Sequence, residues 1–220
     1  MSKVLHHVSA SVLALVAGLL PLSQSVAGSA SATLTLKTRY TKATCLFTRN
    51  GADATGVQVV TMPSVDPKTV NGAGAVDWMG EVVPLNLGMR CQTLPEKDVG
   101  IALTVMPEHR DTSAGNNVIA SKKTTGVNVP GPDLLLVDTG KPDTAVTFSP
   151  GLALPGKSCT GNKPAGTADC LQMSGTGSDY RIPLGIRVFV PAEGKSDFSR
   201  SEMLTPGTWT SVVTLNISYQ

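Results

Sequence analysis

Hydrophobic and polar residues alternate along several segments of the chain, with the period of two that is typical of half-buried β-strands. The alternation is strongest at the C-terminus, where residues 208–220 read TWTSVVTLNISYQ. The large apolar residues of this stretch share one parity: Trp209, Val213, Leu215, Ile217 and Tyr219. The sequence therefore predicts a final strand with one buried face, which needs a neighbouring strand on each side.

Three internal segments alternate in the same way, and no amphipathic helix is predicted. Their apolar positions are Val83, Leu85, Leu87, Met89 and Cys91; Ile101, Leu103 and Val105; and Ile182, Leu184, Ile186, Val188 and Val190. Residues 108–133 and 149–179 are dense in Gly, Pro, Asn, Asp and Ser, so they are expected to be long connections. With 22 glycines and 15 prolines in the chain, this pattern favours a single antiparallel β-sandwich.

The N-terminal part contains a strand of a different kind. Its apolar residues occupy even positions: Ala30, Ala32, Leu34 and Leu36. From Ala43 onward the apolar positions are odd, and a slip of one residue turns side chains to the opposite face. The flip predicts a joint at residues 37–39, between a free-standing strand and the domain that follows.

Residues 1–27 have the features of a secretory signal peptide. Lys3 is the only charged residue, Val8 to Leu22 is almost wholly apolar, and Ser25, Val26 and Ala27 are small. The apolar stretch is shorter than the roughly 20 residues that cross a bilayer, so we expect a soluble exported chain. Cleavage after Ala27 keeps the alternating strand whole, whereas cleavage after Ala32 would remove half of it.

Charge and titratable residues give little support to catalysis or to nucleic-acid binding. The net charge of +2 falls to +1 once Lys3 is removed, which indicates neither nucleic acid nor anionic lipid as a partner. After cleavage His109 is the remaining histidine, and a lone histidine in a turn-rich stretch is interpreted as a surface residue. Asp133, Asp138 and Asp143 lie among Gly and Pro and are interpreted as turn formers. We expect no enzyme, no metal site and no cofactor.

Four cysteines in an exported chain predict two disulfide bonds, for which three pairings exist. Cys159 and Cys170 bracket a Gly- and Pro-rich stretch, and a bond between them would close that loop. Cys45 and Cys91 would then form a long-range bond, worth about 4 kcal/mol on the chain-entropy model. Zinc binding is disfavoured because neither a CxxC motif nor a partner histidine accompanies the cysteines.

These features together resemble the fimbrial (pilus) subunits of the chaperone-usher family. The resemblance consists of the signal peptide, the short amphipathic leader, a cysteine in the first strand and another ending a later strand, with Gly207 and the next-to-last Tyr219 near the C-terminus. It implies an all-β, incomplete immunoglobulin-like sandwich that lacks its last strand and carries a free N-terminal donor strand. The implied organisation is signal peptide 1–27, donor-strand extension 28–37 and pilin domain 38–220.

The resemblance also implies a set of partners and contact residues. A periplasmic chaperone would grip the C-terminal edge beside an open groove, and at an outer-membrane usher the leader of the next subunit would replace it. The implied donor residues are Ala30, Ala32, Leu34 and Leu36, with Ala32 in the tightest position. The implied edge residues are Gly207, Trp209, Val213, Leu215, Ile217, Tyr219 and Gln220. The expected product is a surface fimbria that supports adhesion, with shaft and minor subunit both open.

A second hypothesis belongs to a different class of protein. The chain is then a stand-alone secreted β-sandwich that binds a carbohydrate or a host ligand through its long loops. The two hypotheses differ in one structural expectation. A pilus subunit leaves the place beside its last strand to another molecule, whereas a stand-alone sandwich fills that place itself.

Overall fold

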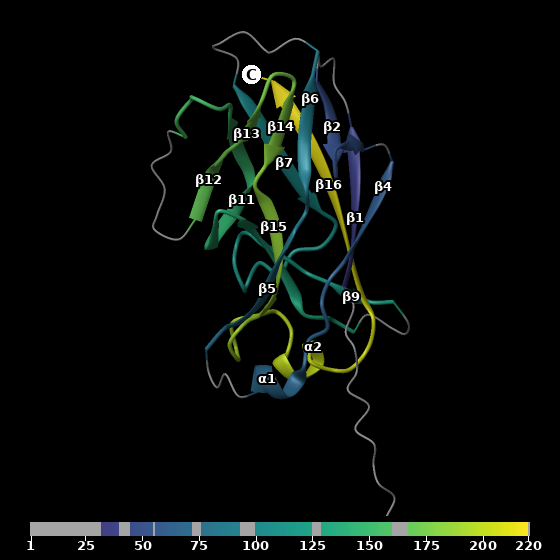
Figure 1. The fold of residues 1–220 in the computed structure, drawn as a ribbon. Helices are drawn as coiled ribbons and strands as arrows, with labels where there is room; N and C mark the ends of the chain where they lie inside the picture. Colours follow the sequence, from purple (N-terminus) through teal and green to yellow (C-terminus); the bar gives the residue numbers. More distant parts are fainter. Residues whose placement is uncertain are drawn as a thin grey trace, which may run out of the picture.

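The computed structural model describes residues 32–39, 45–54, 56–71, 76–92, 100–124, 129–159 and 167–219 (Figure 1). These residues form two β-sheets and two short helices, so the predicted all-β class is confirmed. Among them, no helix combines the length and the apolar character that a bilayer crossing requires.

The larger sheet has eleven strands and contains both ends of the described chain. Its main path is β4 (Val57–Thr61), β1 (Ala32–Arg39), β16 (Trp209–Tyr219), β7 (Ile101–Pro107), β11 (Lys141–Ala153), β10 (Asp133–Asp138), β15 (Leu184–Val190) and β5 (Trp78–Pro84). Three strands lie off this path: β12 (Thr167–Gln172) beside β11, β8 (Val118–Ile119) beside β10, and β9 (Lys122–Lys123) beside β16.

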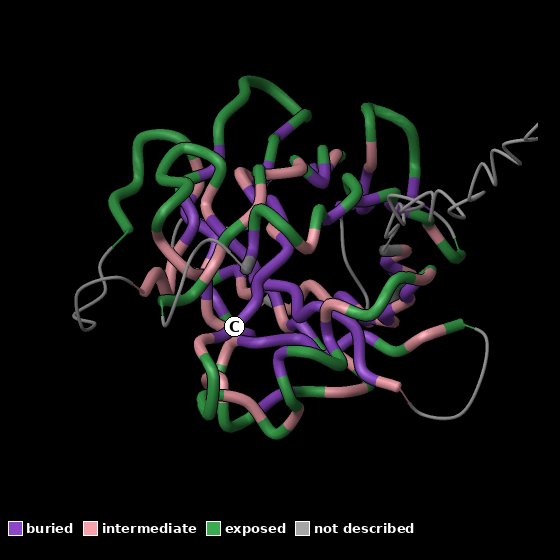
Figure 2. The backbone as a smooth tube through the Cα atoms, turned by 90° about the horizontal axis from the view of Figure 1, so that it is seen from below, coloured by how far each residue is buried: buried purple, intermediate pink, exposed green. Residues whose placement is uncertain are grey.

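The smaller sheet has five strands, and its inner face shares one hydrophobic core with the larger sheet. Its order is β13 (Ser174–Thr176), β14 (Asp179–Ile182), β6 (Leu87–Cys91), β2 (Cys45–Arg49) and β3 (Ala52–Asp53). The core includes Phe47 and Met89 from this sheet and Leu34, Ile186 and Leu215 from the larger one. Figure 2 shows the buried backbone at the centre of the molecule and the exposed segments around it.

Two of the predicted strands each turn out to be two strands that pass from one sheet to the other. The first is divided at Asn86, which has a φ of 52°, between β5 and β6. The second is divided at Pro183, between β14 and β15. Asparagine tolerates the left-handed conformation and proline has no N–H to donate to a ladder, which explains the two breaks. The predicted apolar parity continues across both breaks, because the chain keeps facing the same core.

The two predicted connections are more structured than expected. β8 and β9 lie within residues 108–133, while the end of β11 and all of β12 and β13 lie within residues 149–179. Two short helices were also not predicted, α1 (Pro67–Asn71) and α2 (Arg200–Met203). A proline follows Asp66 at the start of α1, and Ser199 and Glu202 form a capping box at α2. These local signals were present in the sequence.

Two disulfide bonds join Cys45 to Cys91 and Cys159 to Cys170. Cys45 and Cys91 stand directly opposite each other on β2 and β6, and both are buried. This bond fastens the middle of the smaller sheet, and the second bond closes the loop before β12. Disulfides of this kind form in oxidising compartments, so the chain belongs in a non-cytoplasmic environment.

Candidate functional site

The first strand lies between the last strand and β4, so the chain completes its own larger sheet (Figure 1). β1 runs parallel to β16, with Ala32 opposite Trp209 and Arg39 opposite Asn216. On its other edge it runs antiparallel to β4, with Leu34 opposite Val60. The side chains of Leu34 and Leu36 are 0% and 1% exposed. They therefore belong to the core and not to a surface strand.

This arrangement corrects the expectation of a free N-terminal strand and an unfilled groove. In the single chain the groove beside β16 is filled by β1, and β1 continues as one strand through the predicted joint at residues 37–39. The physical reason is that intramolecular pairing costs only loop-closure entropy, whereas pairing with another molecule also costs translational and rotational freedom. The flip in parity has a different cause, since β1 and β2 lie in different sheets.

The implied edge residues of β16 are mostly inside the molecule. Trp209, Val213 and Leu215 are buried, and Ile217 is half-buried. β7 covers one edge of the strand from Val213 to Tyr219, and β1 covers the other edge from Trp209 to Asn216. Ala30, Gln220 and the side chains of Ala32 and Tyr219 lie outside the described residues. The edge of β16 from Trp209 to Asn216 is therefore occupied by β1 of the same chain.

Trp209 anchors the start of β16 in a closely packed pocket. Its side chain is 1% exposed, and Lys123 places its Nζ 5.8 Å from the centre of the indole ring. Gly207 leaves room for that lysine, because a Cβ at residue 207 would lie 2.7 Å from Lys123 Cε. Gly131 lies against the ring itself. A glycine at residue 207 therefore has a local structural explanation, because it leaves space for the lysine side chain that covers Trp209.

Adding one methyl group at Gly131 is expected to destabilise the fold. A Cβ there would lie 2.6 Å from Trp209 Cδ2, so Gly131→Ala must displace a buried ring. We expect a loss of about 1–3 kcal/mol in the free energy of unfolding, measured by urea denaturation. Gly151→Ala is the matched control, because its nearest contact would be an ordinary 3.8 Å. Equal stabilities of the two variants would contradict this account of the pocket.

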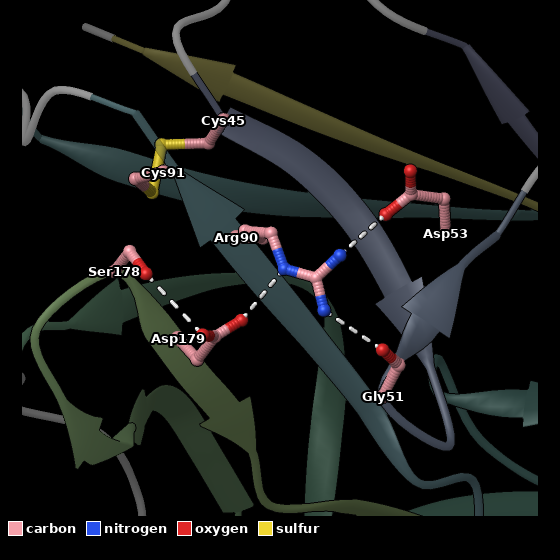
Figure 3. Close-up of polar contacts among 7 residues, drawn as sticks. All are labelled: Cys45, Gly51, Asp53, Arg90, Cys91, Ser178 and Asp179. Carbon is pink, nitrogen blue, oxygen red and sulfur yellow. Dashed lines mark hydrogen bonds and ion pairs between the residues drawn. A yellow bond between two sulfur atoms is a disulfide. The ribbon is translucent and has the colours of Figure 1, made fainter.

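The outer face of the smaller sheet carries a charged network centred on Arg90 (Figure 3). Arg90 donates from Nε to Asp179 at 2.9 Å, from Nη1 to Asp53 at 3.1 Å, and from Nη2 to the carbonyl of Gly51 at 2.9 Å. One arginine thus links β6 to β14 and to the β2–β3 turn. Since Arg90 already meets two carboxylates, its charge is compensated.

A groove of about 720 Å³ lies beside this network on the outer face of the same sheet. Its lining includes Asn50, Asn86 and Arg181 together with Pro84 and Pro183. The backbone N–H of Asn50 donates to the carbonyl of Asn86 at 2.9 Å, which ties the two turns together. None of these residues stood out in the sequence, because they come from separate segments that only the sheet order brings together.

A buried cluster of carboxyl groups lies at the start of β10. Asp133 is 0% exposed, and neither of its carboxyl oxygens has a hydrogen-bond partner among the described residues. Burial, followed by the negative charge of Asp111, raises the pKa of Asp133 to about 9, and the charge of Asp197 acts in the same direction. Asp133 is therefore protonated at neutral pH. The interpretation of Asp133 as a turn former is wrong.

The other residues of this cluster hold two loops together. Asp111 accepts hydrogen bonds from the backbone N–H of Ala114 at 3.0 Å and of Asp197 at 3.3 Å, and the hydroxyl of Ser196 donates to it as well. In the described ranges, no group of three or more His, Cys, Asp or Glu side chains is arranged to hold a metal ion. The arrangement therefore fastens the loop after β15 to the loop after β7.

The remaining residues considered for catalysis form ordinary surface contacts. His109 lies 3.5 Å from Glu108, measured from Nε2 to Oε1. Asp138 accepts from the backbone N–H of Gly140 at 2.8 Å, as a turn former does, and Asp143 pairs with Arg187. These contacts supply no nucleophile with an adjacent base.

Two regions thus stand out, the β1–β16 pairing and the groove beside Arg90. No protein-family model and no curated protein sequence matches this chain.

Proposed function

We propose that the chain is a structural subunit of a surface pilus of the chaperone-usher type, which polymerises by exchange of β1 between copies. The observation that carries the proposal is the position of β1. It is the first described strand, yet it lies inside the larger sheet and contributes two fully buried leucines to the core. In this proposal the domain without β1 is an immunoglobulin-like sandwich with a groove that another copy can fill.

Removal of β1 would expose a long hydrophobic groove. The adjacent edges of β16 and β4 would lose their ladder partners, and the places of Leu34 and Leu36 would be empty. Burial of each leucine side chain contributes about 1.5–3 kcal/mol, and the strand also satisfies backbone groups on both neighbours. A subunit in this state needs a partner, which is the role that the proposal gives to a periplasmic chaperone and an outer-membrane usher.

The backbone groups on the two edges of the groove, β16 and β4, can pair with a strand that runs in either direction. β1 is parallel to β16 and antiparallel to β4, so a reversed strand would be antiparallel to β16 and parallel to β4. Either direction gives one ladder of each type. Because strand side chains alternate with a period of two, a reversed strand would still turn one apolar row inward. The backbone edges of β16 and β4 could therefore pair with a strand from another copy in either direction.

The second candidate is the stand-alone sandwich that binds a carbohydrate or host ligand. The observation in its favour is the same strand, because a chain that fills its own groove is what the stand-alone hypothesis expects and can persist as a monomer. The two candidates differ in whether β1 stays in its own chain or passes to a neighbour.

Complementation with a separate strand tests the proposal. A chain of residues 40–220, refolded with its disulfides intact, is expected to aggregate alone and to form a stable 1:1 complex with a peptide of residues 28–39. The same peptide with Leu34→Asp and Leu36→Asp is the matched control and should not bind. Mass measurement by light scattering after chromatography gives the stoichiometry.

The mature chain provides the complementary measurement. Refolded at increasing concentration, it is expected to form linear oligomers, which an excess of the 28–39 peptide should shorten. A chain that stays monomeric at every concentration, with a truncated form that folds without peptide, would favour the stand-alone sandwich and contradict the assembly proposal.

A further inference from the structure

One cross-strand row on the outer face of the smaller sheet lines the groove. Ser174, Arg181, Gly88 and Thr48 stand directly opposite one another across β13, β14, β6 and β2. Gly88 is closely surrounded, because a Cβ there would lie 2.5 Å from the carbonyl oxygen of Tyr180 and 2.8 Å from Thr48 Oγ1. Glycine within a strand is typical of places where another group approaches the backbone closely, and here Thr48 and the Tyr180 backbone are those groups.

Arg181 is the uncompensated charge in this groove. It is exposed, and no hydrogen bond or ion pair joins it to any other described residue. Arg90, two residues from Gly88 on the same face, differs because Asp53 and Asp179 already hold its guanidinium group. Asp179 is thus occupied by Arg90 rather than by Arg181. An arginine fork without an acidic partner is suited to a carboxylate, which it can bind through two hydrogen bonds.

The rest of the lining is neutral and has unused hydrogen-bonding groups. The side chains of Asn50, Asn86 and Ser174 make no hydrogen bond with other described residues. Amide and hydroxyl groups match the hydroxyls of a sugar ring, and the rings of Pro84 and Pro183 offer apolar surface to its C–H groups. The volume of about 720 Å³ falls within the range of roughly 300–1,000 Å³ found for small-ligand pockets.

An extended peptide is a poorer match for this surface. A peptide that adds to a sheet needs a free strand edge for its backbone hydrogen bonds. Here β14, β6 and β2 lie side by side, and each has a paired strand on both edges. The groove lies over the face of the strands and offers a peptide no free strand edge.

We infer that this groove binds a sugar that carries a carboxylate, with Arg181 holding the acid and Asn50, Asn86 and Ser174 holding ring hydroxyls. A sialic acid and a uronic acid share this chemistry. The inference does not depend on strand exchange, because no lining residue belongs to β1, β4 or β16. It applies equally to a pilus subunit and to a stand-alone sandwich.

Titration of the mature protein with small glycosides tests the inference. The probes are the methyl glycosides of N-acetylneuraminic acid and of glucuronic acid, with methyl glucoside as the neutral sugar and N-acetyl-dialanine as a carboxylate that is not a sugar. At least one acidic sugar is expected to bind, at least tenfold more tightly than either comparison compound. The acid that binds identifies the source of the carboxylate.

Variants at Arg181 then locate the site. Arg181→Gln should weaken binding of the acidic sugar at least tenfold, and Arg181→Lys should retain an intermediate affinity because it keeps the charge but not the fork. Lys195→Gln removes an equal charge from an exposed loop residue outside the groove and should leave the affinity unchanged. Unchanged thermal midpoints will show that the variants fold. The inference is overturned if neither acidic sugar binds, if the dipeptide or neutral sugar binds as tightly, or if Arg181→Gln has no effect.

Discussion

A chain with Leu34→Asp and Leu36→Asp is expected not to accumulate as a folded protein. Both leucines are fully buried between β16 and β4, and each contributes about 1.5–3 kcal/mol of burial that aspartate cannot replace. The substitutions also place two carboxylates against the core, which adds a large desolvation cost. Since a domain is stable by only about 5–15 kcal/mol in total, the expected loss is comparable to the whole stability.

The matched control carries the same two charges on the opposite face of the same strand. Thr33 and Thr35 are half-buried and alternate with the two leucines. Thr33→Asp with Thr35→Asp should lower the free energy of unfolding by no more than about 1 kcal/mol, because surface substitutions usually have small effects. Soluble yield after oxidative refolding and a urea denaturation curve give the comparison. Equal yields from the two double variants would mean that β1 is not part of the core.

Asp133→Asn is expected to stabilise the protein at neutral pH and to change how its stability depends on pH. Asparagine has nearly the same shape and is neutral at every pH, whereas Asp133 must take up a proton to be buried. Its pKa rises from 3.8 to about 9 on folding. The folded state therefore binds the proton more tightly than the unfolded state. The stability from this group is complete below pH 3.8 and is lost as the pH rises towards 9.

The size of the effect follows from the same pKa values. Between these limits the free energy of unfolding of Asp133→Asn rises relative to that of the wild type by about 1.4 kcal/mol for each pH unit. At pH 7 the two free energies of unfolding therefore differ by an amount on the order of 4 kcal/mol. Urea denaturation of both proteins at pH 5, 6, 7 and 8 measures it. Asp138→Asn, at the other end of β10, is the matched control, because it makes the same chemical change at a half-buried turn residue. If the free energies of unfolding of Asp133→Asn and the wild type differ by the same amount at all four pH values, the proposed protonation of Asp133 is contradicted.

Local patterns in the sequence predicted those parts of the fold that depend on which face of a strand is buried. The parities of β7 and of β16 up to Leu215 are as expected, because the core selects one face of each strand. The changes of sheet at Asn86 and Pro183 were not predicted, since the apolar parity does not change there. Alternation shows which side chains face the core, but it does not show which sheet a strand joins.

The alternation of apolar and polar residues also could not predict which strands pair when they are far apart in the sequence. The sequence indicated that β16 needs a neighbour, but a strand's alternation does not specify its partner, which explains why the pairing with β1 of the same chain was not expected. Asp133 was misjudged for a related reason, because its Gly- and Pro-rich surroundings are typical of a turn while its burial comes from distant segments. The groove depends on four strands whose order the sequence does not reveal.

The parallel alignment of the first and last strands determines how the molecule would carry a mechanical load. β1 and β16 point the same way over the whole length from Ala32 to Arg39. A force that pulls the leading end of β1 one way and the trailing end of β16 the other acts along their shared ladder. The evenly spaced hydrogen bonds of a parallel pair are then loaded in shear and stretched together, instead of breaking one after another from one end.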